Sequence, residues 1–167
     1  MGEVQEERKY CYRYVDGNDD EGRPIVMLWK RVIIRETEKT FWHVSDMPMM
    51  NFDQLVKYWT GGNKGQQKKY IKRCAKGAAR SGYHYTREEA LEAFIYRKTF
   101  QLSRIRLIAE TVELCLIGLR EAGYVTYPKD ENGDKKVVIS VAPDSETFLA
   151  ADEPGKIAGT YIWGDYY

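Results

Sequence analysis

A single helical pattern spans residues 86–122. Thr86 and Glu89 have the spacing of a capping box, in which each side chain accepts a hydrogen bond from a backbone N–H at the start of a helix. Gly123, with Arg120 shortly before it, is typical of a helix end. Apolar residues between these signals follow an alternating spacing of four and three that only Lys98 interrupts: Leu91, Ile95, Leu102, Ile105, Ala109, Val112, Leu116 and Leu119. The pattern predicts one helix of about ten turns, where the mean helix has about three. A helix this long must lie across a sheet, pair with a second helix, or do both.

The apolar stripe of this helix decides between those two roles. It also includes Ala90, Phe94, Ile108 and Cys115, which makes it wider than the seam of a strict two-stranded coiled coil. We therefore expect the helix to pack on a sheet. A homodimer through the helix from Thr86 to Gly123 remains an open extension of that expectation.

The remaining patterns predict an α+β domain. Residues 9–44 alternate tyrosines with other residues and then become rich in Ile and Val, as expected for a three-stranded antiparallel meander. Two short basic helices follow within residues 51–80, the first capped by Asn51 and the second over about residues 66–80. A β-hairpin over residues 124–141 has Asn132-Gly133 in its turn. We expect the meander and the C-terminal hairpin to pack on the long helix in one domain of residues 1–167.

Charge is distributed unevenly along the chain, although the net charge is only +1. Residues 54–87 hold nine Lys and Arg residues and no Asp or Glu. A helix over residues 66–80 would carry six of these cations as a basic stripe: Lys68, Lys69, Lys72, Arg73, Lys76 and Arg80. The nearest rings available for stacking belong to Tyr70, Tyr83 and Tyr85. Cations that follow phosphates, beside rings that accept bases, are what single-stranded nucleic acids require of a binding protein.

Three other interpretations of the basic segment stay open. A solvated helix face beside core tyrosines has the same composition. An acidic protein partner would also fit the segment. The acidic and aromatic tail of residues 143–167 offers a third possibility, since it can fold back and cover the basic segment.

Catalytic and metal-binding patterns are weak. The histidines are His43 and His84, and neither has a nucleophile or the ligand spacing of a zinc site nearby in the sequence. We predict no catalytic residues, no metal and no cofactor. A small nucleotide-directed hydrolase is the alternative, and it requires a histidine and a carboxylate to converge in one pocket.

Cysteine usage and hydropathy indicate a cytoplasmic protein. Cys11, Cys74 and Cys115 are far apart and form no CxxC pair, as expected in a reducing compartment. The first residues carry acids where a signal peptide has bases and an apolar run. No apolar stretch has the length of a membrane span, so we expect no membrane partner.

Two segments together resemble a family of small tailed-bacteriophage proteins. They are R-E-T-E-K-T-F-W-H-V at residues 35–44 and Y-H-Y-T-R-E-E-A-L-E-A-F-I-Y-R-K-T-F-Q-L at residues 83–102. That family combines a β-hairpin with a helix that begins with an aromatic residue, Thr, and Glu-Glu-Ala-Leu. The resemblance covers about residues 9–117 and implies a phage origin but no activity. From that origin we expect a protein that engages a host macromolecule, either a defence or transcription component or its nucleic acid. The weak catalytic patterns lead us to expect that it binds without catalysis. A nucleic-acid-binding protein without a protein target is the alternative.

Overall fold

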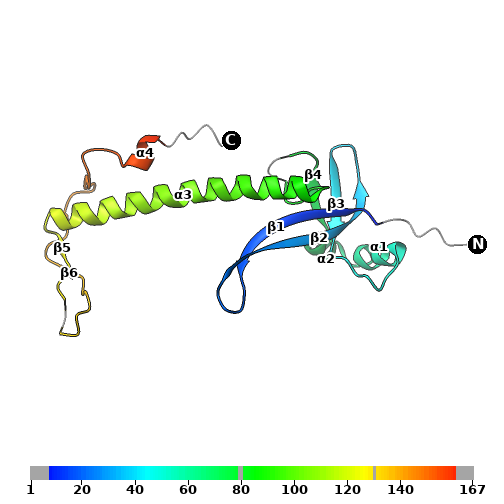
Figure 1. Cartoon of the computed structure of the whole chain (residues 1–167), viewed down its shortest axis with the longest axis horizontal. Coiled ribbons are helices and arrows are strands. Elements are labelled where there is room, and N and C mark those ends of the chain that lie inside the picture. The colour runs from blue at the N-terminus through cyan, green and yellow to red at the C-terminus, as the bar shows by residue number, and fades with distance from the viewer. Residues whose placement is uncertain (1–7, 79–80, 130, 161–167) are drawn as a thin grey trace, which may run out of the picture. The chain divides into compact units, whose positions relative to one another are not determined.

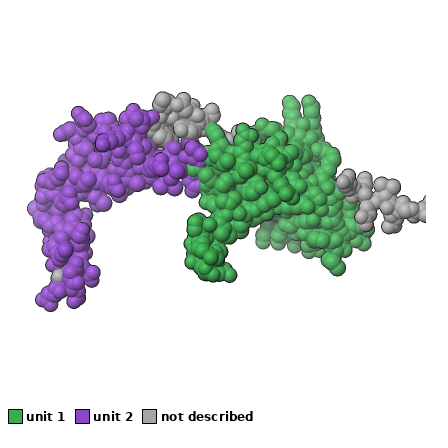
Figure 2. Space-filling view, viewed as in Figure 1, with its two compact units in different colours: residues 1–98 green, residues 99–167 purple. Residues whose placement is uncertain are grey.

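The structure is a computed structural model that describes residues 8–78, 81–129 and 131–160. It confirms the α+β class, with an antiparallel sheet, one long helix and short helices (Figure 1). The chain divides into two compact units, Met1–Lys98 and Thr99–Tyr167 (Figure 2). Helix α3, Arg87–Glu121, contributes residues to both units.

The sheet of the first unit has four antiparallel strands in sequential order. They are β1 (Tyr10–Asn18), β2 (Pro24–Glu36), β3 (Thr40–Val44) and β4 (Lys72–Ala75). The first three strands confirm the predicted meander. Strand β4, which pairs with β3, was not predicted.

The prediction of a helix over residues 66–80 is therefore wrong. Helix α2 covers only Lys64–Tyr70, and the backbone becomes extended at Ile71. The next residues pair with β3, where Cys74 lies opposite the buried Phe41. This pairing satisfies backbone N–H and C=O groups and buries the Cys74 side chain, which outweighs the helix propensity of the Lys, Arg, Gln and Ala residues in this segment. The six cations consequently do not form a stripe on one helix.

Helix α1, Phe52–Thr60, confirms the predicted amphipathic helix after Asn51. The Asn51 side chain accepts a hydrogen bond from the Gln54 N–H at 2.8 Å, and the Gln54 side chain accepts one from the Asn51 N–H at 3.1 Å. Leu55 is fully buried and packs with Val32 and Val44. This capping box and its buried leucine fix α1 against one face of the sheet.

A second cluster of buried residues covers the other face of the sheet. It consists of Cys11, Ile33, Phe41, Cys74 and Tyr83. Ile33 belongs to this cluster, whereas its neighbour Val32 belongs to the cluster around α1. Successive strand residues point to opposite faces, so the sheet has a core on each side.

Helix α3 has the ends that the sequence predicts. Thr86 Oγ1 accepts a hydrogen bond from the Glu89 N–H at 3.1 Å, and Glu89 accepts one from the Thr86 N–H at 3.4 Å. Gly123 has a φ of 77°, and the Tyr124 N–H donates to the Leu119 carbonyl at 3.0 Å. Together with the bond from the Gly123 N–H to Arg120, this is a Schellman motif.

The first turns of α3 pack on β1. Ala90 and Ala93 are buried, and the Phe94 ring lies 6.4 Å from the Tyr14 ring. Arg97 donates a hydrogen bond to the Tyr14 carbonyl at 3.3 Å. These residues repeat every three or four positions, so they form one face of the helix.

The expectation that the apolar stripe packs on the sheet is correct for its members Ala90 and Phe94 and wrong for its row of larger residues, which lies on a different face of α3. The large side chains of this row are 42% to 56% exposed: Leu91, Ile95, Leu102, Ile105, Val112 and Leu116. The small residues Ala90 and Ala93 allow close approach to β1, and packing through them leaves the row of larger residues in solvent.

The second unit contains the last turns of α3, a small hairpin and part of the tail. Strands β5 (Val125–Thr126) and β6 (Val138–Ile139) pair antiparallel, which confirms a hairpin shorter than predicted. A short helix α4, Lys156–Thr160, follows. The aromatic end of the tail from residue 161 onward lies outside the described residues. Within the part of the chain that the structure describes, no helix is both long enough and apolar enough to cross a membrane.

Candidate functional site

A hollow of about 450 Å³ lies between the sheet and the two short helices of the first unit. Strands β2 and β3 form its floor, and α1 and α2 form its wall. Its lining residues are Ile34, Arg35, Trp42, Val56, Thr60, Gln67, Lys68 and Ile71. The lining thus combines an apolar floor with two cations and includes no carboxylate.

Trp42 contacts two arginines beside this hollow. It lies opposite Arg35 on β2 and opposite Arg73 on β4 in the strand register. The guanidinium carbons of Arg35 and Arg73 lie 4.9 Å and 5.8 Å from the centre of the Trp42 ring. Cation–π attraction to a half-buried indole restrains both arginine side chains, and both arginines are exposed residues. Two restrained, exposed guanidinium groups are suited to phosphate or carboxylate oxygens.

Helix α2 places Lys68 at the same hollow as Arg35, and Lys69 beside Tyr70. The Gln67 amide donates hydrogen bonds to the carbonyls of Thr60 and Gly62 at 2.7 Å and 2.8 Å, which ties α2 to the end of α1. Lys68 then lines the hollow, and Lys69 lies 5.4 Å from the centre of the Tyr70 ring.

The rings on this side of the unit also contact one another. Trp59 of α1 lies 5.2 Å from Tyr70, and its indole N–H donates to the Ser45 carbonyl at 3.2 Å. Tyr70 therefore has a fixed position at the rim while 41% of its surface stays exposed. We use "basic face" for the six residues Arg35, Trp42, Lys68, Lys69, Tyr70 and Arg73.

Four of the residues predicted from the sequence belong to the basic face, namely Lys68, Lys69, Tyr70 and Arg73. Lys72 does not belong to it. Its side chain leaves β4 on the side opposite to that of Arg73, because successive strand residues alternate. It lies opposite His43 in the register, on the side of the second core.

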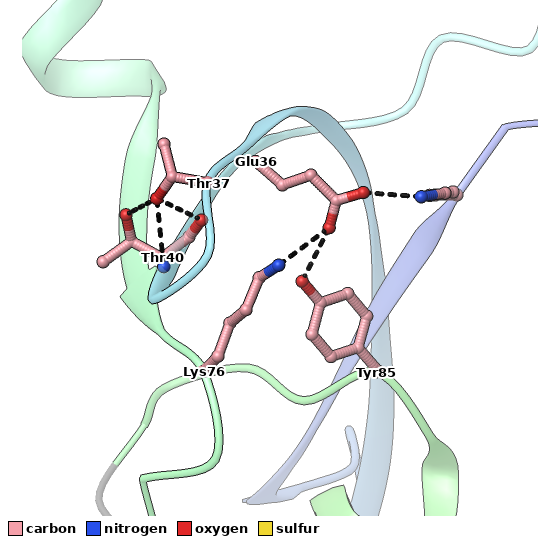
Figure 3. A network of polar contacts seen from close by, with 6 residues as sticks. Glu36, Thr37, Thr40, Lys76 and Tyr85 are labelled. Atoms are coloured by element: carbon pink, nitrogen blue, oxygen red, sulfur yellow. Dashed lines mark hydrogen bonds and ion pairs between the residues drawn. The ribbon is translucent and has the colours of Figure 1, made fainter.

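Lys76 and Tyr85 belong to a structural network around Glu36 (Figure 3). Lys76 pairs with the Glu36 carboxylate at 3.1 Å, the Tyr85 hydroxyl donates to it at 3.0 Å, and Lys9 pairs with it at 2.5 Å. These three hydrogen bonds hold the pKa of Glu36 at about 2. The predicted role of Lys76 and Tyr85 in ligand contact has no support in this arrangement, since both groups join β2 to the segments that follow β4.

Tyr83 is only 7% exposed, so its ring is not available for stacking with a ligand. Its ring centre lies 4.2 Å from that of His43 in the second core. Arg80 lies outside the described residues.

Sequence analysis missed Arg35 and Trp42, although both have a recognisable signal. They stand on either side of the tight turn between β2 and β3, where a cross-strand Arg–Trp pair is favourable. The strand register is regular from the turn as far as this pair, with Glu36 opposite Phe41 and Arg35 opposite Trp42, and it shifts only farther along, between Ile33 and Arg35. Counting back from the turn therefore reveals the pair.

The histidines do not form the acid–base pair that a hydrolase requires. His43 Nε2 lies 3.4 Å from the Cys74 sulfur, and both side chains are buried in the second core. Asp46, the carboxylate nearest to His43 in sequence, pairs with Arg8 at 2.5 Å. His84 Nε2 lies 3.2 Å from the Ser81 carbonyl. Among the described residues there is also no group of three or more His, Cys, Asp and Glu side chains placed to hold a metal ion.

Comparison with known proteins returned no relative: no protein-family model, curated protein or solved structure matches this chain.

Proposed function

We propose that this protein is a phage-encoded binding protein that acts without catalysis in the cytoplasm of an infected bacterium. Its target is a host macromolecule, a defence or transcription component or the nucleic acid of that component. The basic face makes the contact, and its ligand is the phosphate backbone of a nucleic-acid strand. The phage origin and the host target rest on the resemblance of residues 35–44 and 83–102. The observation that carries the proposed contact is the pair of guanidinium groups whose carbons lie 4.9 Å and 5.8 Å from the centre of the Trp42 ring.

Nucleic acid fits this face better than an acidic peptide does, for two reasons. Lys68 and Lys69 extend the positive charge of the arginines, which suits a continuous polyanion. Tyr58 and Tyr70 are 55% and 41% exposed beside them, and such rings stack on bases without sequence preference. An acidic peptide would use the cations but not the rings.

We also propose that the protein self-associates as a homodimer through α3. The exposed apolar stripe supports this proposal, since solvent contact of so many large side chains on one helix is unfavourable. The basic face and the stripe belong to different parts of the chain, so each proposal has its own test.

Affinity capture from bacterial lysate tests the binding function. The tagged full-length protein is used in two halves of one lysate, one treated with nuclease and one untreated. We expect the tagged protein to recover nucleic acid from the untreated half and none from the nuclease-treated half, because the phosphate backbone is the ligand. A protein that remains bound after nuclease treatment, with no nucleic acid recovered from the untreated half, identifies a host protein as the direct target and rejects nucleic acid as the ligand.

Two charge reversals make the capture specific for the basic face. Arg73→Glu should abolish recovery, because it removes one guanidinium and repels phosphate near the other. Lys135→Glu, a reversal of an exposed lysine in the hairpin segment of the second unit, is the matched control and should retain recovery. Equal recovery by the two variants contradicts a role for the basic face.

A further inference from the structure

The exposed stripe of α3 has a regular heptad spacing between Leu102 and Leu119. In heptad notation, Leu102, Ala109 and Leu116 occupy position a, and Ile105, Val112 and Leu119 occupy position d. The large side chains Ile105, Val112 and Leu116 are 53%, 51% and 49% exposed. A repeat of 3.5 residues on an exposed helix is the pattern that packs against another helix.

The tail of the same chain contacts α3 away from this stripe. The Glu110 carboxylate accepts hydrogen bonds from the N–H groups of Ile157 and Ala158, at 2.9 Å and 3.2 Å. Gly118 is buried against the Ala150 backbone, where a Cβ atom would clash. Glu110 and Gly118 occupy heptad positions b and c, on the outer side of the helix relative to a and d. The described part of the tail thus leaves the stripe open.

We propose that the occupant of the stripe is the same helix of a second copy, packed antiparallel. This inference rests on the self-association proposed above and adds its orientation and register. In this register Leu102 of one copy faces Leu119 of the other. The next layers place Ile105 against Leu116 and Ala109 against Val112. Because a two-fold axis relates the two copies, each of these three contacts occurs twice along the seam. Every layer is apolar, and each pairs a position a with a position d.

Charge complementarity favours this register. Arg106 and Glu113 occupy position e, and in an antiparallel pair the e residues of the two helices face each other. Arg106 of each copy lies beside Glu113 of the other, which gives two opposite-charge contacts across the seam. Lys98, the one charged residue in the stripe, then faces the helix end at Gly123 and stays clear of the apolar layers. It is already paired with Asp16 at 2.6 Å.

A parallel pair in register has the opposite properties. It places the two Lys98 side chains in one layer, where like charges repel. It also places Ile108 beside Glu113 and Cys115 beside Arg120, because position g of one helix then faces position e of the other. The same sequence therefore discriminates between the two orientations.

Cysteine cross-linking tests the orientation directly. Ile105→Cys and Leu116→Cys are made separately in full-length protein carrying Cys115→Ser, which removes an exposed thiol and leaves the buried Cys11 and Cys74. The antiparallel register predicts a disulfide-linked dimer when the two variants are mixed and oxidised. It predicts little cross-linking when either variant is oxidised alone. Two copies of position 105 would then be about 16 Å apart along the helix, too far for a disulfide. Efficient cross-linking of Ile105→Cys with itself overturns the antiparallel register.

Sedimentation of charge variants separates orientation from self-association. Val112→Glu should weaken the dimer about tenfold or more, because it puts a carboxylate in a central layer. Ile95→Glu is the matched control, since Ile95 is 56% exposed on the same stripe but lies beyond the antiparallel overlap. It should leave the dimer unchanged, whereas a parallel dimer would lose stability from both changes.

A charge exchange completes the test. Arg106→Glu and Glu113→Arg should each weaken the dimer, and the double variant should restore it because the two contacts are re-formed with reversed sign. A dimer that cross-links only as a parallel pair rejects the register and keeps the proposed self-association. A chain that stays monomeric at every concentration, with no cross-link from any mixture, rejects both.

Discussion

At the scale of single residues, His43 is the group with the clearest energetic consequence. Its side chain is fully buried, and among the described contacts its Nδ1 atom has no hydrogen-bond partner. Burial, together with the nearby charges of Arg31 and Lys72, lowers its pKa from 6.5 to about 4. The folded protein therefore holds His43 neutral at pH values where the unfolded chain has protonated it.

This difference predicts that stability falls as the pH is lowered. Between pH 6.5 and about 4 the unfolded state binds a proton that the folded state does not bind. The free energy of unfolding should thus decrease through this window, by roughly 3 kcal/mol at its lower end. Urea unfolding measured across the window reports the decrease.

The variant His43→Gln isolates this effect. It keeps a polar side chain beside Cys74 but has no titrating ring. Whatever the absolute stability of this variant, its free energy of unfolding should not show the pH-dependent decrease that is assigned to His43. His84→Gln is the control and should retain the decrease. If wild type and His43→Gln have the same pH dependence, buried neutral His43 is not its cause.

At the scale of elements, the end of α3 depends on one glycine. Gly123 has a φ of 77° in the Schellman motif, in a region that costs other L-residues roughly 1–2 kcal/mol. Gly123→Ala should lower the free energy of unfolding by about 1 kcal/mol. Gly123→Asn should lower it less, because Asn adopts this conformation more easily. Equal losses for the two variants in urea unfolding would show that the backbone conformation is not the determinant.

The elements that sequence analysis predicted correctly are those with local signals. Helix α3 has its capping box and terminal glycine within its own sequence, and α1 has Asn51 and Gln54. Strand β4 has no such signal. It forms because β3 offers an unpaired edge and a buried place for Cys74, and both arise from residues about thirty positions earlier in the chain. Local propensity does not contain that information.

The candidate site was likewise predictable only where its residues lie close together in the sequence. Lys68, Lys69 and Tyr70 were found because a run of cations without acids is visible in one segment. Arg35 and Trp42 join them only through strand pairing, and Lys76 and Tyr85 leave the set because Glu36 binds both. Composition indicates a basic segment, whereas the ion pairs and the register determine which of its charges remain available.

At the scale of the whole molecule, the two compact units have separate tasks in this account. The first unit carries the basic face, and the second carries the apolar layers of the proposed dimer. A dimer would carry two basic faces, which a nucleic-acid strand long enough to reach both would bind together. Once one face is bound, the second binds at a high effective concentration, which raises the overall affinity without any new contact.

The most direct test of the central claim is the salt dependence of binding to a fluorescent single-stranded oligonucleotide, measured by anisotropy. Three or four cations of the basic face on phosphates predict a slope of about −2 to −3 for the logarithm of the binding constant against the logarithm of salt concentration. Arg73→Glu should reduce both the affinity and the slope on every sequence tested, and Lys135→Glu should change neither. Binding that is insensitive to salt, or equally strong in Arg73→Glu, would contradict a nucleic-acid contact through the basic face.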